Sequence, residues 1–160
     1  MQNLTELRWL DISLTAVTDI SPLAESRFDA AARGGEGFRL QLSGRTIGDY
    51  GPLGAIENYS ELCFDGDADS ARWADVLEGV QIRRLQFSHS GFDNESFAAF
   101  VRTHPELRVL WIPWNESITD LTPLLELPDL ETADISYSMK KAAASLEGKA
   151  YDFELIVEQP

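Results

Sequence analysis

The stretch Glu106–Leu124 reads E-L-R-V-L-W-I-P-W-N-E-S-I-T-D-L-T-P-L, and its apolar residues stand at fixed offsets. The first half fits the pattern Leu-x-x-Leu-x-Leu-x-x-Asn, which is carried by Leu107, Leu110, Ile112 and Asn115. Alternation here predicts a short strand, with Leu110 and Ile112 facing inward and Val109 and Trp111 facing outward. The second half ends in Asp-Leu-Thr-Pro-Leu, which predicts a turn that leads the chain away from the strand.

The same pattern recurs about every 22 to 25 residues along the chain, which is the spacing of a repeat architecture. Equivalent strands are predicted around Leu10 and Ile12, Leu40 and Leu42, Leu62 and Phe64, Leu85 and Phe87, Leu110 and Ile112, and Ala133 and Ile135. The ending Asp-φ-x-Pro-Leu, where φ is apolar, occurs at Asp19–Leu23, Asp49–Leu53 and Asp120–Leu124. Three copies in one short chain indicate a true repeat.

These motifs resemble the leucine-rich repeat, and the Asp-φ-x-Pro-Leu ending resembles the bacterial-type repeats of internalins and the repeats of phosphatase-regulating proteins. The units around Tyr59–Glu78 and Ile82–Thr103 are similar to the longer, helix-backed repeats of ribonuclease-inhibitor type. The resemblance implies an α/β leucine-rich-repeat solenoid, with a curved parallel sheet on the concave face and short helices and turns on the convex face. About six repeats are expected over residues 4–147, followed by a capping strand within about 149–158. Residues 1–160 then form a single domain, or a segment of a longer protein.

Local signals predict the return segments of these units. A short helix is expected at Glu25–Arg33, and a return limb at Ala142–Leu146. A second helix is expected at Ser70–Glu78, with Ser70 as its cap and with Trp73, Val76 and Leu77 inward. A third is expected at Asn94–Thr103, with Phe97, Phe100 and Val101 inward. The position of Asn115 is taken in the other units by Thr15, Arg45, Asp67, Ser90 and Ser138. Nothing comparable to a cap precedes Leu4, so the first unit is expected to fray or self-associate.

Composition narrows the class of protein. The chain carries 27 acidic and 13 basic residues, a formal charge of -14, which argues against nucleic-acid binding. The acidity suits a basic protein partner, or it simply keeps a monomer soluble.

No apolar run approaches the ~20 residues of a membrane helix, and Met1–Leu10 is not a secretory signal. We therefore expect no membrane insertion and a cytoplasmic location. The single Cys63 fits a reducing compartment.

No set of residues predicts catalysis, a metal or a cofactor, so the chain is not expected to be an enzyme. Asp65–Ser70 spaces its acids like a calcium loop, but Ser70 and Val76 replace the glycine and glutamate of that motif, which favours an acidic turn. Cys63 and His89 are predicted to lie about 11 Å apart, too far for a nucleophile and its base. His104, at a helix end before Pro105, is expected at the surface.

The outward strand positions give the stronger functional signal. They form columns across the sheet, and exposed aromatic side chains there are typical of protein interfaces. The candidate binding residues are His89, Val109, Trp111, Trp114, Tyr137, Trp9, Arg39 and Arg84. They predict a non-catalytic protein-protein interaction module that binds a protein through its concave face, unless the terminal strand or a neighbouring domain covers them. Two alternatives stay open: an acidic inhibitor or immunity-type protein of a basic enzyme, and a structural spacer in a longer protein. No motif identifies the partner or sets an oligomeric state.

Overall fold

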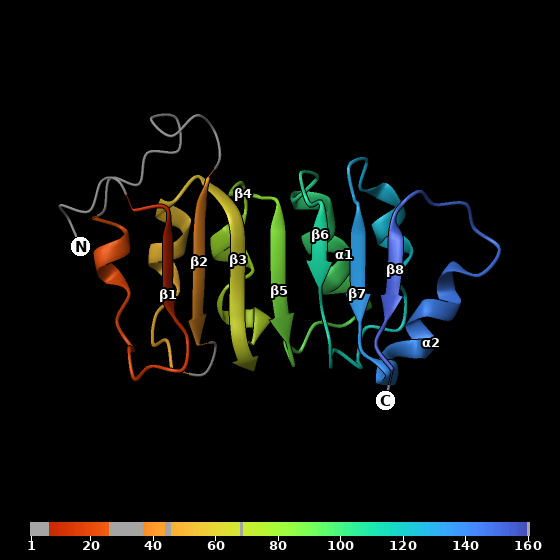
Figure 1. Cartoon of the computed structure of the whole chain (residues 1–160), viewed down its shortest axis with the longest axis horizontal. Helices are drawn as coiled ribbons and strands as arrows, with labels where there is room; N and C mark the ends of the chain where they lie inside the picture. The colour runs from red at the N-terminus through yellow and green to blue at the C-terminus, as the bar shows by residue number, and fades with distance from the viewer. Residues whose placement is uncertain (1–6, 26–36, 44–45, 68, 160) are drawn as a thin grey trace.

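A parallel β-sheet organises the chain in the computed structural model, which describes residues 7–25, 37–43, 46–67 and 69–159. The sheet has eight strands within these residues, and their order is β1-β2-β3-β5-β6-β7-β8, with β4 paired to β3 (Figure 1). The strands are β1 Trp9–Ile12, β2 Phe38–Ser43, β3 Asn58–Asp67, β4 Gln81–Ile82, β5 Arg84–Ser88, β6 Val109–Trp111, β7 Thr132–Ile135 and β8 Glu154–Val157. The fold is therefore α/β, with each long strand beside its neighbour in the sequence.

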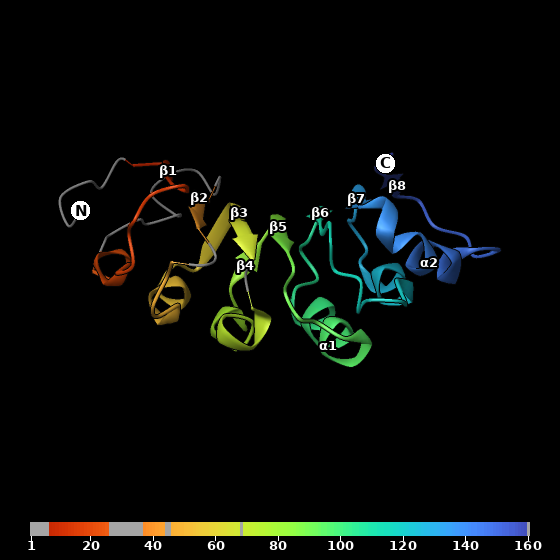
Figure 2. The same cartoon turned by 90° about the horizontal axis from the view of Figure 1, so that it is seen from below.

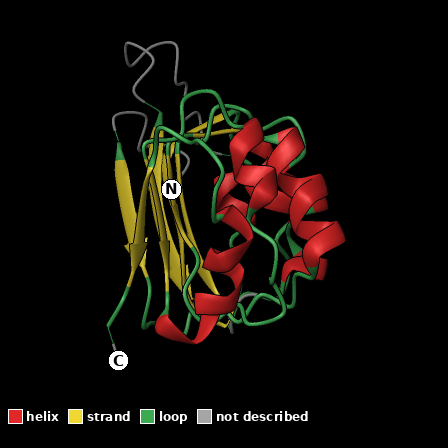
Figure 3. Cartoon of the chain, turned by 90° about the vertical axis from the view of Figure 1, so that its right-hand side faces the viewer, coloured by secondary structure: helices red, strands yellow, loops and turns green. Residues whose placement is uncertain are grey.

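Short helical segments return the chain to the start of the next strand. They are the α-helices α1 Asn94–Thr103 and α2 Lys140–Ala143 and the 3₁₀ turns η1 Ser21–Leu23, η3 Gly51–Ala55, η4 Ser70–Arg72, η5 Asp75–Leu77, η6 Thr122–Glu126, η7 Tyr137–Met139 and η8 Ala144–Leu146. Seen from below, the sheet is bowed and the helical segments fan out on its outer side (Figure 2). Figure 3 shows one layer of strands and one layer of helices, with no described helix on the far side of the sheet.

The inward strand residues form one continuous ladder. Parallel pairing sets Leu10, Leu40, Leu62, Leu85, Leu110, Ala133 and Leu155 side by side across the sheet. The members from Leu40 to Ala133 inclusive are buried. Leu10 and Leu155, at the two edges of the sheet, are only partly buried. Because strand side chains alternate, this register turns the intervening residues to the opposite face. The strand predictions for these residues are confirmed.

The Asp-φ-x-Pro-Leu endings form the same turn three times. The carboxylates of Asp19, Asp49 and Asp120 each accept a bond of 2.8 Å from the backbone N–H two residues later. A 3₁₀ turn with proline in its first positions follows in each case. The apolar residues of the motif are buried: Ile20, Leu23, Tyr50, Leu53, Leu121 and Leu124. An aspartate that bonds its own backbone and a proline with fixed φ together define this geometry.

Asn115 links its own unit to the preceding one through its buried side-chain amide. Its carbonyl oxygen accepts bonds from the N–H and the hydroxyl of Ser90, at 2.8 and 2.6 Å. Its NH₂ donates to the carbonyl oxygens of Phe87, Ile112 and Pro113. Because a buried amide without partners is costly, this bonding explains why Asn suits the position.

Two local predictions are wrong. Ser70–Glu78 is not a helix but the two turns η4 and η5, and the side chain that caps η4 is Asp69 rather than Ser70. Trp73 leaves the helical backbone geometry at φ -131°, and its buried ring stacks on Phe64 with centroids 4.7 Å apart. Burial of this large ring outweighs the local helix signal.

His104 is the second correction, because it is fully buried rather than at the surface. Its Nδ1 lies 2.8 Å from the carbonyl oxygen of Phe100, and its Nε2 lies 3.0 Å from that of Leu77. The imidazole therefore lies between the end of α1 and η5 of the preceding unit, with one ring nitrogen close to a carbonyl oxygen of each.

The other local predictions have mixed outcomes. Helix α1 occupies the predicted residues Asn94–Thr103 and buries Phe97, Phe100 and Val101. The return limb predicted at Ala142–Leu146 is confirmed, and it begins two residues earlier, because α2 and η8 together cover Lys140–Leu146. The terminal strand β8 extends the sheet in parallel beside β7. Glu25–Arg33, apart from Glu25, and Leu4 lie outside the described residues, so they stay predictions.

Candidate functional site

Large exposed apolar side chains gather on the face of the sheet that no described helix covers. We call this the open face: the outward residues of β1–β8 and the residues that directly follow each strand. The large exposed apolar residues on this face are Trp9, Leu14, Trp111, Trp114, Tyr137 and Ile156. The other two in the described part of the chain, Leu125 and Tyr151, lie elsewhere on the molecule. Trp9 is 54% and Trp114 50% exposed, so both indoles present substantial apolar area to water.

The middle of the open face is hollowed. A cavity of about 210 Å³, here the central hollow, is lined by Glu61, Arg84, Leu85, Gln86, Val109 and Trp111. Its residues come from the three adjacent strands β3, β5 and β6, in the register that pairs Arg84 with Val109 and Gln86 with Trp111. The structure thus brings together three of the candidate residues, namely Arg84, Val109 and Trp111. The hollow offers the indole of Trp111, the guanidinium of Arg84 and the carboxylate of Glu61, so it can bind a partner side chain that has both apolar and polar parts.

Three bulky residues of the open face have a left-handed backbone. Leu14, His89 and Trp114 have φ values of 53°, 46° and 61°, and Gly66, which stands at the equivalent position, has φ 76°. This conformation costs an L-residue about 1–2 kcal/mol, and glycine avoids most of that cost. The side chains are retained despite the cost, which is a pattern found at functional sites.

Hydrogen bonds between neighbouring units hold two of these residues in place. The N–H of Leu14 donates to Oγ of Ser43, and the N–H of Trp114 donates to Oγ of Ser136, both at 2.9 Å. The rings of His89 and Trp114 are parallel within 3°, with centroids 6.3 Å apart. His89 and Trp114, two of the candidate residues, therefore form one aromatic platform at the strand ends.

The N-terminal part of the open face is internally paired. The Arg39 guanidinium lies 4.9 Å from the centroid of the Trp9 ring, and it forms an ion pair of 2.9 Å with Glu61. The charge of Arg39 is therefore balanced within the chain. Trp9 and Arg39, which the sequence placed in the same binding set as Trp111, form a separate cluster around β1–β3.

Tyr137 is the candidate residue that follows β7. The ammonium of Lys140 sits 4.5 Å from the centroid of its ring and donates to its hydroxyl at 3.1 Å. This pairing fixes the phenol while leaving much of it exposed. A partner that meets Tyr137 therefore meets a cation on the same ring.

Asp134 belongs to the open face, although the sequence prediction did not include it. It pairs in register with Trp111 on β6 and with Ile156 on β8. Its Oδ1 is buried and, among the described residues, has no hydrogen-bond partner. Burial raises the pKa of Asp134, and the nearby Glu158 raises it further. The signal in the sequence was a carboxylate whose neighbours in its column are both apolar.

The strands also place the residues first considered for chemistry. Cys63 is buried, and burial, reinforced by Glu61, Asp65 and Asp11, raises the pKa of its thiol to about 12. A thiol that stays protonated near neutral pH is a poor nucleophile. Of the acidic run Asp65–Ser70, Asp69 accepts from the Ala71 N–H at the start of η4. Within the described part of the chain, no group of three or more His, Cys, Asp or Glu residues has metal-binding geometry.

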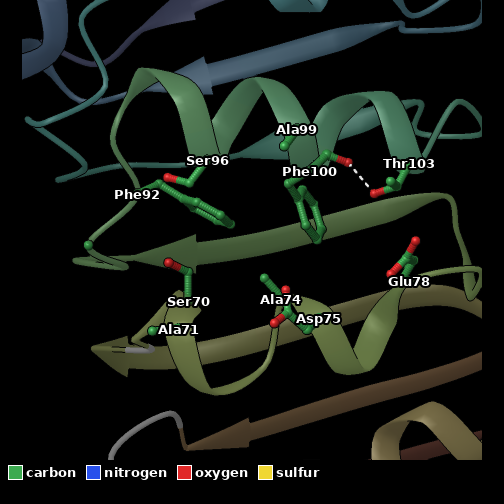
Figure 4. Close-up of a pocket in the computed structure, with 11 residues that line it drawn as sticks. Ser70, Ala71, Ala74, Asp75, Glu78, Phe92, Ser96, Ala99, Phe100 and Thr103 are labelled. Carbon is green, nitrogen blue, oxygen red and sulfur yellow. Dashed lines mark hydrogen bonds between the residues drawn. The ribbon is translucent and has the colours of Figure 1, made fainter.

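A larger hollow of about 470 Å³ lies on the helical side, between the η4–η5 segment and α1. Figure 4 shows small side chains along it, among them Ala71 and Ala74 from one wall and Ala99 from the other. Asp75 and Glu78 stand on the η5 wall, opposite the end of α1. The hollow thus lies between two 3₁₀ turns on one side and an α-helix on the other.

The comparisons with known proteins add no relative: no protein-family model and no curated protein matches this chain. Among the described residues, no helix is both long and apolar enough to cross a lipid bilayer.

Proposed function

We propose that this chain is a leucine-rich-repeat solenoid of about six repeats that acts as a non-catalytic protein-binding module. Three observations support the repeat assignment: the continuous inward ladder, the three equivalent aspartate turns, and the buried amide of Asn115 between units. Units also bury apolar residues against the adjacent unit, as Trp73 does against Phe87, which is how repeat architectures build a continuous core.

The binding proposal depends on one observation above all. Exposed Trp, Tyr and Leu side chains concentrate on the open face, and two of them, Leu14 and Trp114, occupy positions where glycine is less strained. Large amphipathic rings on a rigid sheet are what a protein interface uses for its central contacts. No described residue set on this face resembles a nucleophile with a base, so binding explains the arrangement better than catalysis.

The experiment that tests this proposal compares two double variants in affinity capture from an extract of the native organism. Trp111→Ser with Trp114→Ser removes the two indoles from the open face. Leu125→Ser with Tyr151→Ser removes two exposed apolar side chains that lie elsewhere on the molecule. We expect the first pair to weaken capture of a specific partner by about 2 kcal/mol or more, and the second to leave it unchanged.

Both double variants are first checked by circular dichroism and a denaturant melt. Equal capture by both variants, with both folded, would contradict binding through the open face and would favour the spacer function. Loss of capture in the control alone would move the binding site to the surface around Leu125 and Tyr151.

A further inference from the structure

The C-terminal third of the open face has an unbalanced negative charge. Strands β6, β7 and β8 contain no lysine or arginine, while Asp134, Glu154 and Glu158 lie on or directly after β7 and β8. Two cations close in sequence to these strands already have partners in the chain: Lys140 lies on the Tyr137 ring, and Arg108 pairs with Glu131 at 3.5 Å. This end of the face therefore attracts a basic group from outside the chain.

Asp134 differs from the other open-face carboxylates in having a buried oxygen without a partner. Glu61 pairs with Arg39 at 2.9 Å. Asp11, which occupies the same column as Asp134 on β1, accepts bonds from the N–H and the hydroxyl of Ser13 at 2.9 and 2.7 Å. Oδ1 of Asp134 has neither kind of bond. A buried acceptor left without a donor is destabilising, so its retention calls for a donor supplied on binding.

The neighbours of Asp134 define the shape of that donor. Trp111 on one side and Ile156 on the other are both exposed apolar side chains, so the carboxylate lies between two apolar walls. A guanidinium is planar, stacks on an indole, and donates two parallel N–H bonds to a carboxylate. An ammonium is a more strongly hydrated point charge without a flat face. An arginine side chain therefore fits this position better than a lysine does.

We propose that Asp134, with Trp111 as its stacking wall, is the seat for an arginine side chain presented by a basic protein partner. This inference rests on the proposed function, since it names the chemistry of the partner at the open face. Glu158, whose charge acts on Asp134, adds to the attraction. The partner is accordingly a protein whose contact surface presents an exposed arginine.

The test uses three short peptides of the same sequence that differ in one central residue: arginine, lysine or citrulline. Citrulline keeps the shape of arginine but has no charge. Binding is followed by nuclear magnetic resonance, through the shift of the Trp111 indole N–H and of the Asp134 amide. We expect the arginine peptide to bind at least about tenfold more tightly than the citrulline peptide, and the lysine peptide to be intermediate.

Asp134→Asn and Asp11→Asn form a matched pair, because both remove one charge from the same column. Asp134→Asn should weaken binding of the arginine peptide about tenfold or more, whereas Asp11→Asn should change it less than about twofold. Equal binding of the arginine and citrulline peptides by the wild-type chain would overturn the inference, whether or not a variant folds. Unchanged binding by a folded Asp134→Asn variant would overturn it as well.

Failure of the arginine-binding inference can be distinguished from failure of the proposed function. If Trp111→Ser with Trp114→Ser abolishes capture of the native partner but Asp134→Asn does not, the open face binds a protein and the arginine seat is wrong. If the arginine peptide requires Asp134 while the tryptophan variants retain full capture of the native partner, Asp134 binds arginine side chains, but that partner is captured elsewhere on the molecule and binding of it through the open face is wrong.

Discussion

Replacing Leu14 by glycine should stabilise the fold, although it removes a large apolar side chain. Leu14 is 89% exposed, so about a tenth of the side chain is buried and its loss costs only about 0.2–0.3 kcal/mol. Its backbone has φ 53°, a conformation that costs an L-residue about 1–2 kcal/mol. Glycine relieves that strain but adds about 0.5–1 kcal/mol of chain entropy to the unfolded state. The balance favours Leu14→Gly by up to about 1 kcal/mol.

Leu14→Ala is the matched control, because it removes the side chain and keeps the strain. It should leave the free energy of unfolding within about 0.5 kcal/mol of the parent chain. Urea melts of the three proteins measure the difference as a shift in midpoint at constant slope. If Leu14→Gly is less stable than Leu14→Ala, the left-handed backbone is not a source of strain, and the argument that these side chains are kept for function loses its basis.

The remaining predictions concern the core, the aspartate turns and the sheet edge. Leu110→Ala should destabilise the fold by about 2–5 kcal/mol in a denaturant melt, because Leu110 is fully buried between two neighbouring rungs; a loss below about 1 kcal/mol would remove it from the core. Backbone hydrogen bonds lower the pKa of Asp19 and of Asp120, so their contribution to stability is present at neutral pH and is lost as pH falls below about 4. Asn at both positions keeps the turn but not the charge, so the melting temperature of that variant should fall less steeply between about pH 4 and 2 than that of the parent; parallel profiles would contradict this. Amide hydrogen exchange should be faster in β1 than in β5, because β1 is an edge strand with partly buried ladder residues, and slow exchange at residues 9–12 in a monomer would refute the expected fraying.

The parts of the fold that the sequence predicted are those set by local pattern. Alternation placed Leu110 and its equivalents inward because the side-chain period of a strand is two wherever one face is buried. Helix α1 was predicted at its observed bounds because Phe97, Phe100 and Val101 recur at helical spacing. The aspartate turns were predicted because aspartate and proline shape the backbone within five residues.

The parts that the sequence did not predict depend on contacts between units. The Ser70–Glu78 segment carries helix signals, but the Trp73 ring packs against Phe64 of the same unit and Phe87 of the next, and that packing sets the turns. His104 is polar and stands at a helix end, which predicts a surface position. Its burial follows from the carbonyl oxygen of Leu77, in the preceding unit, which lies 3.0 Å from its Nε2. Neither contact is visible in a window of local sequence.

For the candidate site, the sequence predicted the columns but not their energetics. Arg84, Val109 and Trp111 do line one hollow, and His89 does stack with Trp114. The strain at Leu14 was missed, though a usable signal existed, since Gly66 shares its column and glycine marks positions of positive φ. The unpartnered oxygen of Asp134 is a three-dimensional property, because it depends on which donors fail to reach it.

The order of strands in the sheet also bears on how the chain acquires its structure. Each ladder residue pairs with the equivalent residue of the next unit, so Leu62 can pair as soon as the strand that contains Leu85 has been synthesised. Loop closure between such neighbours is entropically cheap, since its cost rises with the length of chain enclosed. Units released in sequence during synthesis can therefore dock one upon another as they emerge, each using the previous rung as its template. Of the described strands, β8 emerges last, and until it pairs with β7, Asp134 lacks its apolar neighbour Ile156.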